Sequence, residues 1–338
     1  MAFLLRLVQR TSDALGRGPM LGQWAEGYDN NLDALRLVGA VLVIFAHSFP
    51  IARSPDNILP PFYKSHYGLI GVDIFFIISG FLITKSYLRS NNPGRFVWSR
   101  FLRIFPALVF VTLTLVFVLG PILTTLPTNE YFKHPWTFSY LRGALSLYEV
   151  TRYTVLPGVF MDNFFIQVNG PLWTLQYEWT FYMIILLLGL TNLLRRKGLI
   201  IALFLTSLVL TLLNVGDTAD TLYWTPVKYL PAFFMYFSFG MLAYLYRDSI
   251  PMTLGAFLFV VAMLAVGSLK GGFSDSVFVF FLGYLVLFVG FSPKIRLRWL
   301  TKSGDYSYGL YIWGWPVQQS VSHFMGGGGA SVWLQLTV

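Results

Sequence analysis

The sequence contains no cysteine, which excludes disulfide bonds, thiolate nucleophiles and cysteine-based metal sites. Its four histidines form neither an HExxH pattern nor any similar metal-binding spacing, so we expect no metal site. Charged residues make up only 12% of the chain, which is about half of their usual share in a soluble domain. This shortage of charge excludes an ordinary soluble globular protein.

Hydrophobic residues, by contrast, make up 56% of the 338 residues, and aromatic residues make up 18%. They are grouped in runs separated by short polar segments, as is typical of a multi-pass membrane protein. We therefore predict an all-α fold, a polytopic membrane helix bundle with about nine spans. The runs cover residues 33–52, 68–88, 104–123, 171–194, 199–214, 227–246, 252–269, 277–292 and 304–324.

The chain is expected to have two parts. Residues 1–27 mix arginines with apolar residues, which predicts an amphipathic lead on the cytoplasmic membrane surface. Residues 28–338 are predicted to form a single transmembrane domain, in which residues 124–170 are an outer non-spanning segment. After the ninth run, the chain passes through glycines 326–329 into SVWLQLTV, which we interpret as the start of a truncated tenth helix.

Basic residues determine the predicted orientation. The net charge of +9 comes from 24 lysines and arginines against 15 acidic residues. These basic residues lie between the hydrophobic runs and not on a soluble surface, so we expect a lipid bilayer and no nucleic acid as the partner. Cytoplasmic loops are enriched in lysine and arginine, and most of the basic residues share one side if the N-terminus is cytoplasmic. We therefore predict a cytoplasmic N-terminus.

The stretch NLDALRLVGAVLVIFAHSFP, residues 31–50, places Arg36 near the start of the first run and His47 well inside it. The gap between them corresponds to about 16 Å of helix rise and close to three turns, so both side chains point roughly the same way. An ionisable residue within a membrane usually faces the bundle interior or a wet cavity, and it suggests function. The alternative is a neutral, hydrogen-bonded histidine with Arg36 as an interfacial anchor.

Two further arginines follow the second run. The stretch RFVWSRFLRIFP places Arg100 and Arg103 three residues apart, on one face of a helix start. Together with Arg36, they would form a basic cluster at the cytoplasmic face. Guanidinium groups bind phosphates bidentately, so three converging arginines would suit a nucleotide-bearing cofactor such as coenzyme A. Anchoring of helix ends in the cytoplasm explains the same residues without a ligand.

Two carboxylates also lie in the hydrophobic runs. Glu178, in NGPLWTLQYEWTFY, is predicted at a depth similar to that of His47, where it would orient the imidazole and favour its proton acceptance. The alternative is a structural hydrogen bond with a protonated Glu178. Asp73, in GVDIFFIISGFLIT, is either functional or a helix-end partner. In the same block, Ser79 and Gly80 are interpreted as small packing residues.

The ninth run contains the aromatic and amide stretch YSYGLYIWGWPVQQ, with Tyr311, Trp313 and Gln318. Such side chains commonly line sugar-binding sites, because aromatic rings offer a flat apolar surface with a polar edge. Aromatic residues also form belts at membrane interfaces, which explains the same stretch without a ligand.

Taken in this order, the motifs resemble acyltransferase family 3 of integral membrane proteins, over residues 31 to about 320. The matching residues are the family's first-helix arginine and histidine at Arg36 and His47, its paired arginines at Arg100 and Arg103, and its glutamate at Glu178. The family often carries a histidine between the two tryptophans of the aromatic block. Here that position is Gly314, so a second histidine role is not expected.

The resemblance implies a ten-helix enzyme of the bacterial inner membrane. It would transfer an acyl group, usually acetyl, from acyl-CoA in the cytoplasm to a hydroxyl of a cell-surface or exported carbohydrate or glycolipid. We expect His47 to be the general base, oriented by Glu178 or Asp73. The expected acetyl-CoA-binding residues are Arg36, Arg100 and Arg103. The expected carbohydrate-binding residues are Trp173, Tyr177, Tyr311, Trp313 and Gln318.

A transporter or flippase for a glycan or a lipid-linked sugar is the alternative class of protein. In it, the same buried charges would line a pathway without covalent chemistry. Dependence on acyl-CoA separates the two classes. The sequence leaves open whether the protein forms a homo-oligomer and which carbohydrate and acyl chain it uses.

Overall fold

The computed structural model describes residues 18–27, 30–54, 67–90, 92–215, 221–222, 225–226, 229–269, 271–327 and 331–337. The described chain is mainly helical, which confirms the predicted fold class. A short antiparallel ladder joins β1 (Thr221–Leu222) to β2 (Thr225–Pro226). Residues 1–17 of the predicted lead and residues 328–329 of the glycine tract lie outside the described residues.

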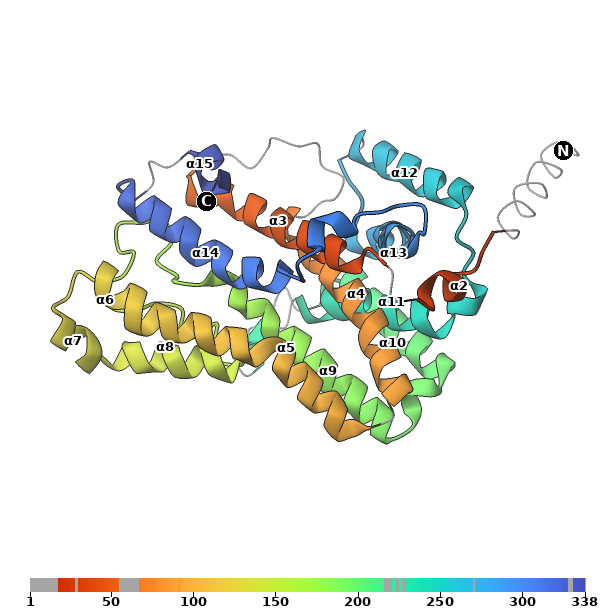
Figure 1. Cartoon of the computed structure of the whole chain (residues 1–338), viewed down its shortest axis with the longest axis horizontal. Coiled ribbons are helices and arrows are strands. Elements are labelled where there is room, and N and C mark those ends of the chain that lie inside the picture. Colours follow the sequence, from red (N-terminus) through yellow and green to blue (C-terminus); the bar gives the residue numbers. More distant parts are fainter. Residues whose placement is uncertain are drawn as a thin grey trace, which may run out of the picture.

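Each predicted hydrophobic run forms a helix (Figure 1). These helices are α3 (Leu32–Ile51), α4 (Tyr67–Ser90), α5 (Pro93–Thr114) with its continuation η1 (Leu115–Leu119) and α6 (Gly120–Leu123), α9 (Leu175–Leu190), α10 (Lys197–Leu212), α11 (Leu230–Leu245), α12 (Leu254–Leu269), α13 (Asp275–Phe291) and α14 (Ser307–Phe324). Within the described chain, three segments are long and apolar enough to cross a membrane, namely Leu32–Ile51, Tyr67–Ser90 and Pro93–Leu123. The number of nine spans and the cytoplasmic N-terminus stay predictions.

Shorter elements connect these helices. The helices are α2 (Leu21–Ala25), α7 (Thr128–Lys133), α8 (Pro135–Ser146) and α15 (Val332–Thr337), and the 3₁₀ turns are η2 (Gly170–Thr174), η3 (Leu193–Arg195), η5 (Arg247–Ser249) and η6 (Arg298–Thr301). Helices α7 and α8 belong to the predicted non-spanning segment, and α8 packs along α5 (Figure 1). Helix α15 packs against α3.

Helix α5 starts at Pro93, whereas the hydrophobic pattern predicts a start at residue 104. The side chain of Asn92 accepts a hydrogen bond from the backbone N–H of Arg95 at 3.0 Å, and proline occupies the first helical position. Both features are strong helix-start signals. Arg100 and Arg103 therefore lie well inside the helix and not at its start. The hydrophobic pattern misses the true start because the first section of the helix is polar.

Close helix crossings depend on glycine. A Cβ atom on Gly71 would lie 2.3 Å from the carbonyl oxygen of Gly39, where α4 crosses α3. A Cβ atom on Gly80 would lie 1.9 Å from the carbonyl oxygen of Phe237, where α4 crosses α11. The predicted packing role of Gly80 is therefore confirmed, since any side chain there would force α4 and α11 apart.

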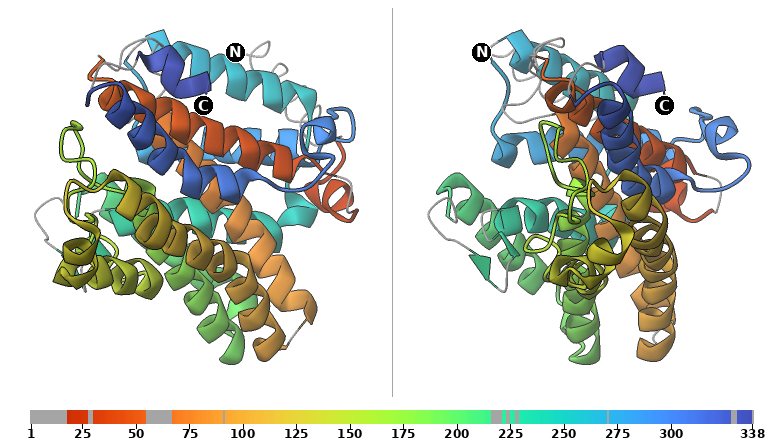
Figure 2. Two further views of the ribbon diagram at one scale, coloured as in Figure 1. Left: turned by 60° about the vertical axis from the view of Figure 1, so that its left-hand side comes forward. Right: turned by 90° about the vertical axis from the view of Figure 1, so that its left-hand side faces the viewer.

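Helices α3 and α14 lie side by side, as Figure 1 and the two views of Figure 2 show. Arg36 at the start of α3 is near Asp305, which directly precedes α14. Towards the other end of both helices, His47 packs against Trp315. The two helices therefore run in the same direction, and α14 follows the stripe of α3 that carries Arg36 and His47.

Candidate active site

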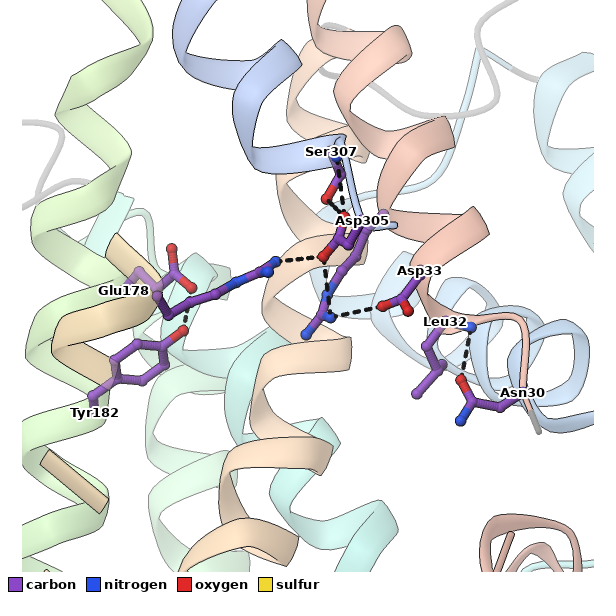
Figure 3. A network of polar contacts seen from close by, with 9 residues as sticks. Asn30, Leu32, Asp33, Glu178, Tyr182, Asp305 and Ser307 are labelled. Carbon is purple, nitrogen blue, oxygen red and sulfur yellow. Dashed lines mark hydrogen bonds and ion pairs between the residues drawn. The ribbon is translucent and has the colours of Figure 1, made fainter. Parts of the chain in front are cut away.

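Asp305 joins two of the predicted arginines. Its Oδ2 atom lies 2.8 Å from Nη2 of Arg103 and 3.8 Å from Nη1 of Arg36 (Figure 3). Its Oδ1 atom accepts hydrogen bonds from the backbone N–H of Ser307 at 3.0 Å and from the hydroxyl of Ser307 at 2.5 Å. One carboxylate thus holds the start of α14 to both α3 and α5.

The charge of Asp305 depends on these partners. Burial alone would raise the pKa of Asp305, which lies just before the start of α14. The charge of Arg103, hydrogen bonds from Ser307 and Arg103, and the charge of Arg36 together hold this pKa below its ordinary value. The carboxylate is therefore ionised at neutral pH.

Sequence reasoning missed Asp305. An aspartate just before a helix is an ordinary helix-start residue, and the contact with Ser307 fits that interpretation. Asp305 also forms ion pairs with Arg103, which is 202 residues away in the sequence, and with Arg36. The stretch GDYSYG contains no pattern that indicates these partners.

A pocket lies between α3, α4, α5, α9 and α14, and we call it the arginine pocket. Its lining residues include Arg36, Ser79, Arg103, Glu178, Tyr308 and Tyr311. Ser79, which we interpreted as a packing residue, therefore also faces this space. The sequence correctly predicts that Arg36 and Arg103 converge.

Glu178 belongs to the arginine pocket and accepts a hydrogen bond from the hydroxyl of Tyr182, one helical turn further along α9 (Figure 3). Arg100 lies over the ring of Tyr182, with its guanidinium carbon 5.7 Å from the ring centroid. Arg100 therefore contacts Tyr182 beside the arginine pocket, whereas Arg36 and Arg103 line the pocket itself.

A second pocket, which we call the histidine pocket, contains the predicted base. Its lining residues include His47, Val72, Pro171, Trp173, Thr174 and Tyr311. The imidazole of His47 packs edge-on against the indole of Trp315, with 4.9 Å between the ring centroids. The indole Nε1 of Trp315 donates a hydrogen bond to the carbonyl of Gln167 at 2.9 Å, which fixes the ring that supports His47.

The two pockets adjoin. Val72, Thr174 and Tyr311 line both of them. The hydroxyl oxygens of Thr174 and Tyr311 lie 2.5 Å apart at this junction. Arg36 and His47, which lie on one face of α3, therefore line two neighbouring pockets.

Glu178 and His47 line different pockets, whereas the sequence predicts that they pair at a similar depth. Glu178 lines the arginine pocket, and His47 lines the histidine pocket. Helix α3 ends at Ile51, so His47 is near the end of its helix. The structure therefore groups Glu178 with the arginines, and its predicted pairing with His47 has no support from this geometry.

Asp73, the other candidate for orienting His47, lies between α4 and α11. Its side chain is beside Tyr236, and both residues are almost completely buried. Neither pocket includes Asp73 among its lining residues. This buried position between two helices fits a packing contact, and the expected role of Asp73 in orienting His47 stays a prediction.

The five predicted carbohydrate-binding residues divide into two groups. Tyr311 lines both pockets, and Trp173 lines the histidine pocket, where its indole lies 4.8 Å from the ring of Tyr229. Tyr177 packs edge-on against a phenylalanine of α11, and Trp313 packs against a phenylalanine of α5. Gln318 donates a hydrogen bond to a backbone carbonyl of α3 at 3.0 Å. These last three residues serve helix contacts in the structure.

No group of three or more His, Asp or Glu side chains in the described part of the chain is placed to hold a metal ion.

Comparison with known proteins agrees with the motif order. The sequence model of the Acyltransferase domain family (Acyl_transf_3) matches residues 29–338, which is nearly the whole chain. The chain belongs to acyltransferase family 3. It is therefore an acyltransferase, and its apolar helices identify it as a membrane protein.

Proteins similar to this chain include two that are named as O-acetyltransferases. The chain is 31% identical over 303 residues to the O-acetyl transferase of Shigella phage Sf6, and the match covers 86% of this chain and 85% of that protein. It is 34% identical over 163 residues to nodulation protein 10 of Rhizobium leguminosarum bv. viciae, which covers 47% and 44%. It is 30% identical over 176 residues to the peptidoglycan O-acetyltransferase OatA of Listeria monocytogenes, which covers 48% and 24%. No solved structure matches the chain.

Gly314, between the two tryptophans of the aromatic block, lies close to α3. A Cβ atom built on Gly314 would lie 2.7 Å from Cγ1 of Ile44 on α3. A side chain at this position would therefore require Ile44 to move. The close contact of α14 with α3 therefore leaves little room for a side chain at Gly314.

Proposed function

We propose that this acyltransferase transfers an acetyl group from acetyl-CoA to a carbohydrate hydroxyl at the bacterial inner membrane. The observation that supports this proposal is that the two pockets are neighbours. Arg36, in a cluster suited to phosphates, and His47, suited to proton transfer, lie on the same face of α3, and their pockets share Thr174 and Tyr311 as lining residues. An acyl donor held by the arginines would therefore place its reactive end beside an acceptor near His47.

The arginine pocket would bind the phosphates of acetyl-CoA. Arginine has five N–H donors, and the recorded contacts of Arg103 with Asp305 involve a single nitrogen atom, Nη2. The remaining donors suit bidentate contacts with phosphate oxygens. The negative charge of Asp305 offsets the repulsion between the guanidinium groups of Arg36 and Arg103, so that both can stay in the pocket before the donor binds.

His47 would act as the general base. It lies on the acceptor side of the junction, where an imidazole can accept the proton of a sugar hydroxyl as that hydroxyl attacks the thioester. Trp173 lines the same pocket and would offer an apolar face to a sugar ring. The name O-acetyl transferase of one relative supports acetyl transfer to a hydroxyl, and the name peptidoglycan O-acetyltransferase of another supports a glycan as the acceptor.

The test uses purified protein in lipid nanodiscs with acetyl-CoA and a panel of bacterial polysaccharides and peptidoglycan fragments. Because the chain has no cysteine, a thiol reagent reports released CoA without a background from the protein. We expect acceptor-dependent CoA release and an acetyl mass increment on the glycan. If the protein neither binds CoA nor releases it with any acceptor, the proposal is wrong, and transport of a glycan becomes the better account.

A further inference from the structure

Two buried hydroxyls mark the junction between the arginine pocket and the histidine pocket. Thr174 is the last residue of η2, and Tyr311 lies in α14. Each residue is only 6% exposed, and their hydroxyl oxygens are 2.5 Å apart. The ring of Tyr311 is held edge-on by Phe75 of α4, with 5.8 Å between the centroids. The position of the phenol oxygen is therefore well fixed.

The carbonyl oxygen of Pro171 completes this group. It lies 3.2 Å from the hydroxyl oxygen of Thr174 and 3.2 Å from that of Tyr311. Three oxygen atoms thus share two hydroxyl protons. The hydroxyl of Thr174 can donate a hydrogen bond to the carbonyl of Pro171 by itself. The hydroxyl of Tyr311 is then able to donate its proton to another acceptor without leaving this buried carbonyl unpaired.

The proposed acetyl transfer creates such an acceptor. The sugar oxygen forms a bond to the thioester carbonyl carbon while its proton passes to His47, and the carbonyl π electron pair moves onto the carbonyl oxygen. The tetrahedral intermediate then re-forms the C=O bond, the C–S bond breaks, and the CoA thiolate takes the proton back from His47. If the phosphates bind in the arginine pocket and the acceptor binds in the histidine pocket, the thioester would lie at the junction, which Thr174 and Tyr311 line.

We propose that the hydroxyl of Tyr311 donates the hydrogen bond that stabilises this oxyanion, and that Thr174 is the positioning residue that frees its proton. This inference rests on the proposed acetyl-CoA reaction. A phenol is a stronger donor to a developing negative charge than an aliphatic alcohol, and a buried donor fixed in advance is worth more than one in water. Helix α9 begins directly after Thr174, so the positive end of its dipole also faces the junction.

The experiment compares Tyr311→Phe with wild type in steady-state kinetics, CoA binding and thermal stability. Removal of a single oxyanion donor typically lowers kcat by about 10²–10³-fold. We expect a loss of kcat in this range, with the KM for acetyl-CoA and the Kd for CoA changed by less than about threefold, since neither depends on the oxyanion. Tyr284→Phe is the matched control, because its hydroxyl donates to the carbonyl of Pro251 away from both pockets.

Thr174 variants test the positioning role. Thr174→Val leaves Tyr311 as the local donor to the carbonyl of Pro171, so kcat should fall while CoA binding persists, and Thr174→Ser should restore kcat. An unchanged kcat in Tyr311→Phe, or a loss confined to CoA affinity or Tm, overturns the inference while wild-type turnover still supports the proposed function. An inactive wild-type protein overturns both.

Discussion

Oδ2 of Asp305 lies 2.8 Å from Nη2 of Arg103, and this ion pair connects the start of α14 to α5. The same carboxylate oxygen faces Arg36 on α3 at 3.8 Å. Three helices that are far apart in the sequence therefore meet at one charged group (Figure 3). This contact brings Arg36 and Arg103 into one pocket and holds α14 beside the stripe of α3 that leads to His47.

The two arginines of α5 should differ in their effect on donor binding. Arg103 lines the arginine pocket, whereas Arg100 lies over the ring of Tyr182. Arg103→Gln should weaken CoA binding by about 10–100-fold, which corresponds to the loss of one or two charge-assisted hydrogen bonds. Arg100→Gln should weaken it less. Isothermal titration in detergent measures both, with the exposed Arg95→Gln as the control. Equal effects of the Arg100 and Arg103 substitutions would contradict the placement of the phosphates.

Asp305 should stabilise the protein over a defined pH range. Because its pKa is lowered in the folded protein, its contribution is fully present above about pH 4, the ordinary value of an aspartate, and is lost as the pH falls through the lowered value. Asp305→Asn should therefore lower Tm by about 2–4 °C, a shift that corresponds to roughly 1–2 kcal/mol. The difference from wild type should be constant between about pH 5 and 8 and shrink below about pH 4. A difference that disappears already near neutral pH would contradict this account.

Glu178 offers a test of which group orients His47. In the structure, Glu178 belongs to the arginine pocket, so Glu178→Gln should lower turnover about tenfold by disturbing Tyr182 and the arginines. The acid limb of the kcat profile should stay at the same pH, because that limb reports the base. A shift of the limb towards lower pH would instead restore the pairing of Glu178 with His47 that the sequence predicts.

The crossing of α4 and α11 should not tolerate a methyl group. Gly80→Ala would place Cβ 1.9 Å from the carbonyl oxygen of Phe237, so the helices must separate. We expect a lower Tm and a broadened size-exclusion peak. Gly255→Ala in α12 is the control, since a Cβ atom there meets no atom within 4 Å. Equal stability of both variants would show that the crossing is looser than the structure indicates.

Hydrophobic periodicity predicts the helices well, because each run must bury its backbone hydrogen bonds within itself in a membrane. It misplaces the start of α5 because Arg95 and its neighbours make the first section polar. The convergence of Arg36 and Arg103 could be predicted from their charge and their positions along the chain. The contacts of Asp305 and Thr174 could not be predicted, because each joins segments that are far apart in the sequence. The predicted pairing of Glu178 with His47 stays a prediction, because Glu178 lines the arginine pocket and His47 lines the histidine pocket.

The most direct measurement of the central claim compares CoA binding and acetyl transfer in His47→Gln. The account predicts that CoA binds within about twofold of wild type, because the arginine pocket is intact, while acetyl transfer falls by at least about 10²-fold through loss of the base. His323→Gln, at the far end of α14, should retain both activities. Transfer at a rate close to wild type in His47→Gln would contradict the claim that the arginine pocket and His47 are the two ends of one acyl-transfer site.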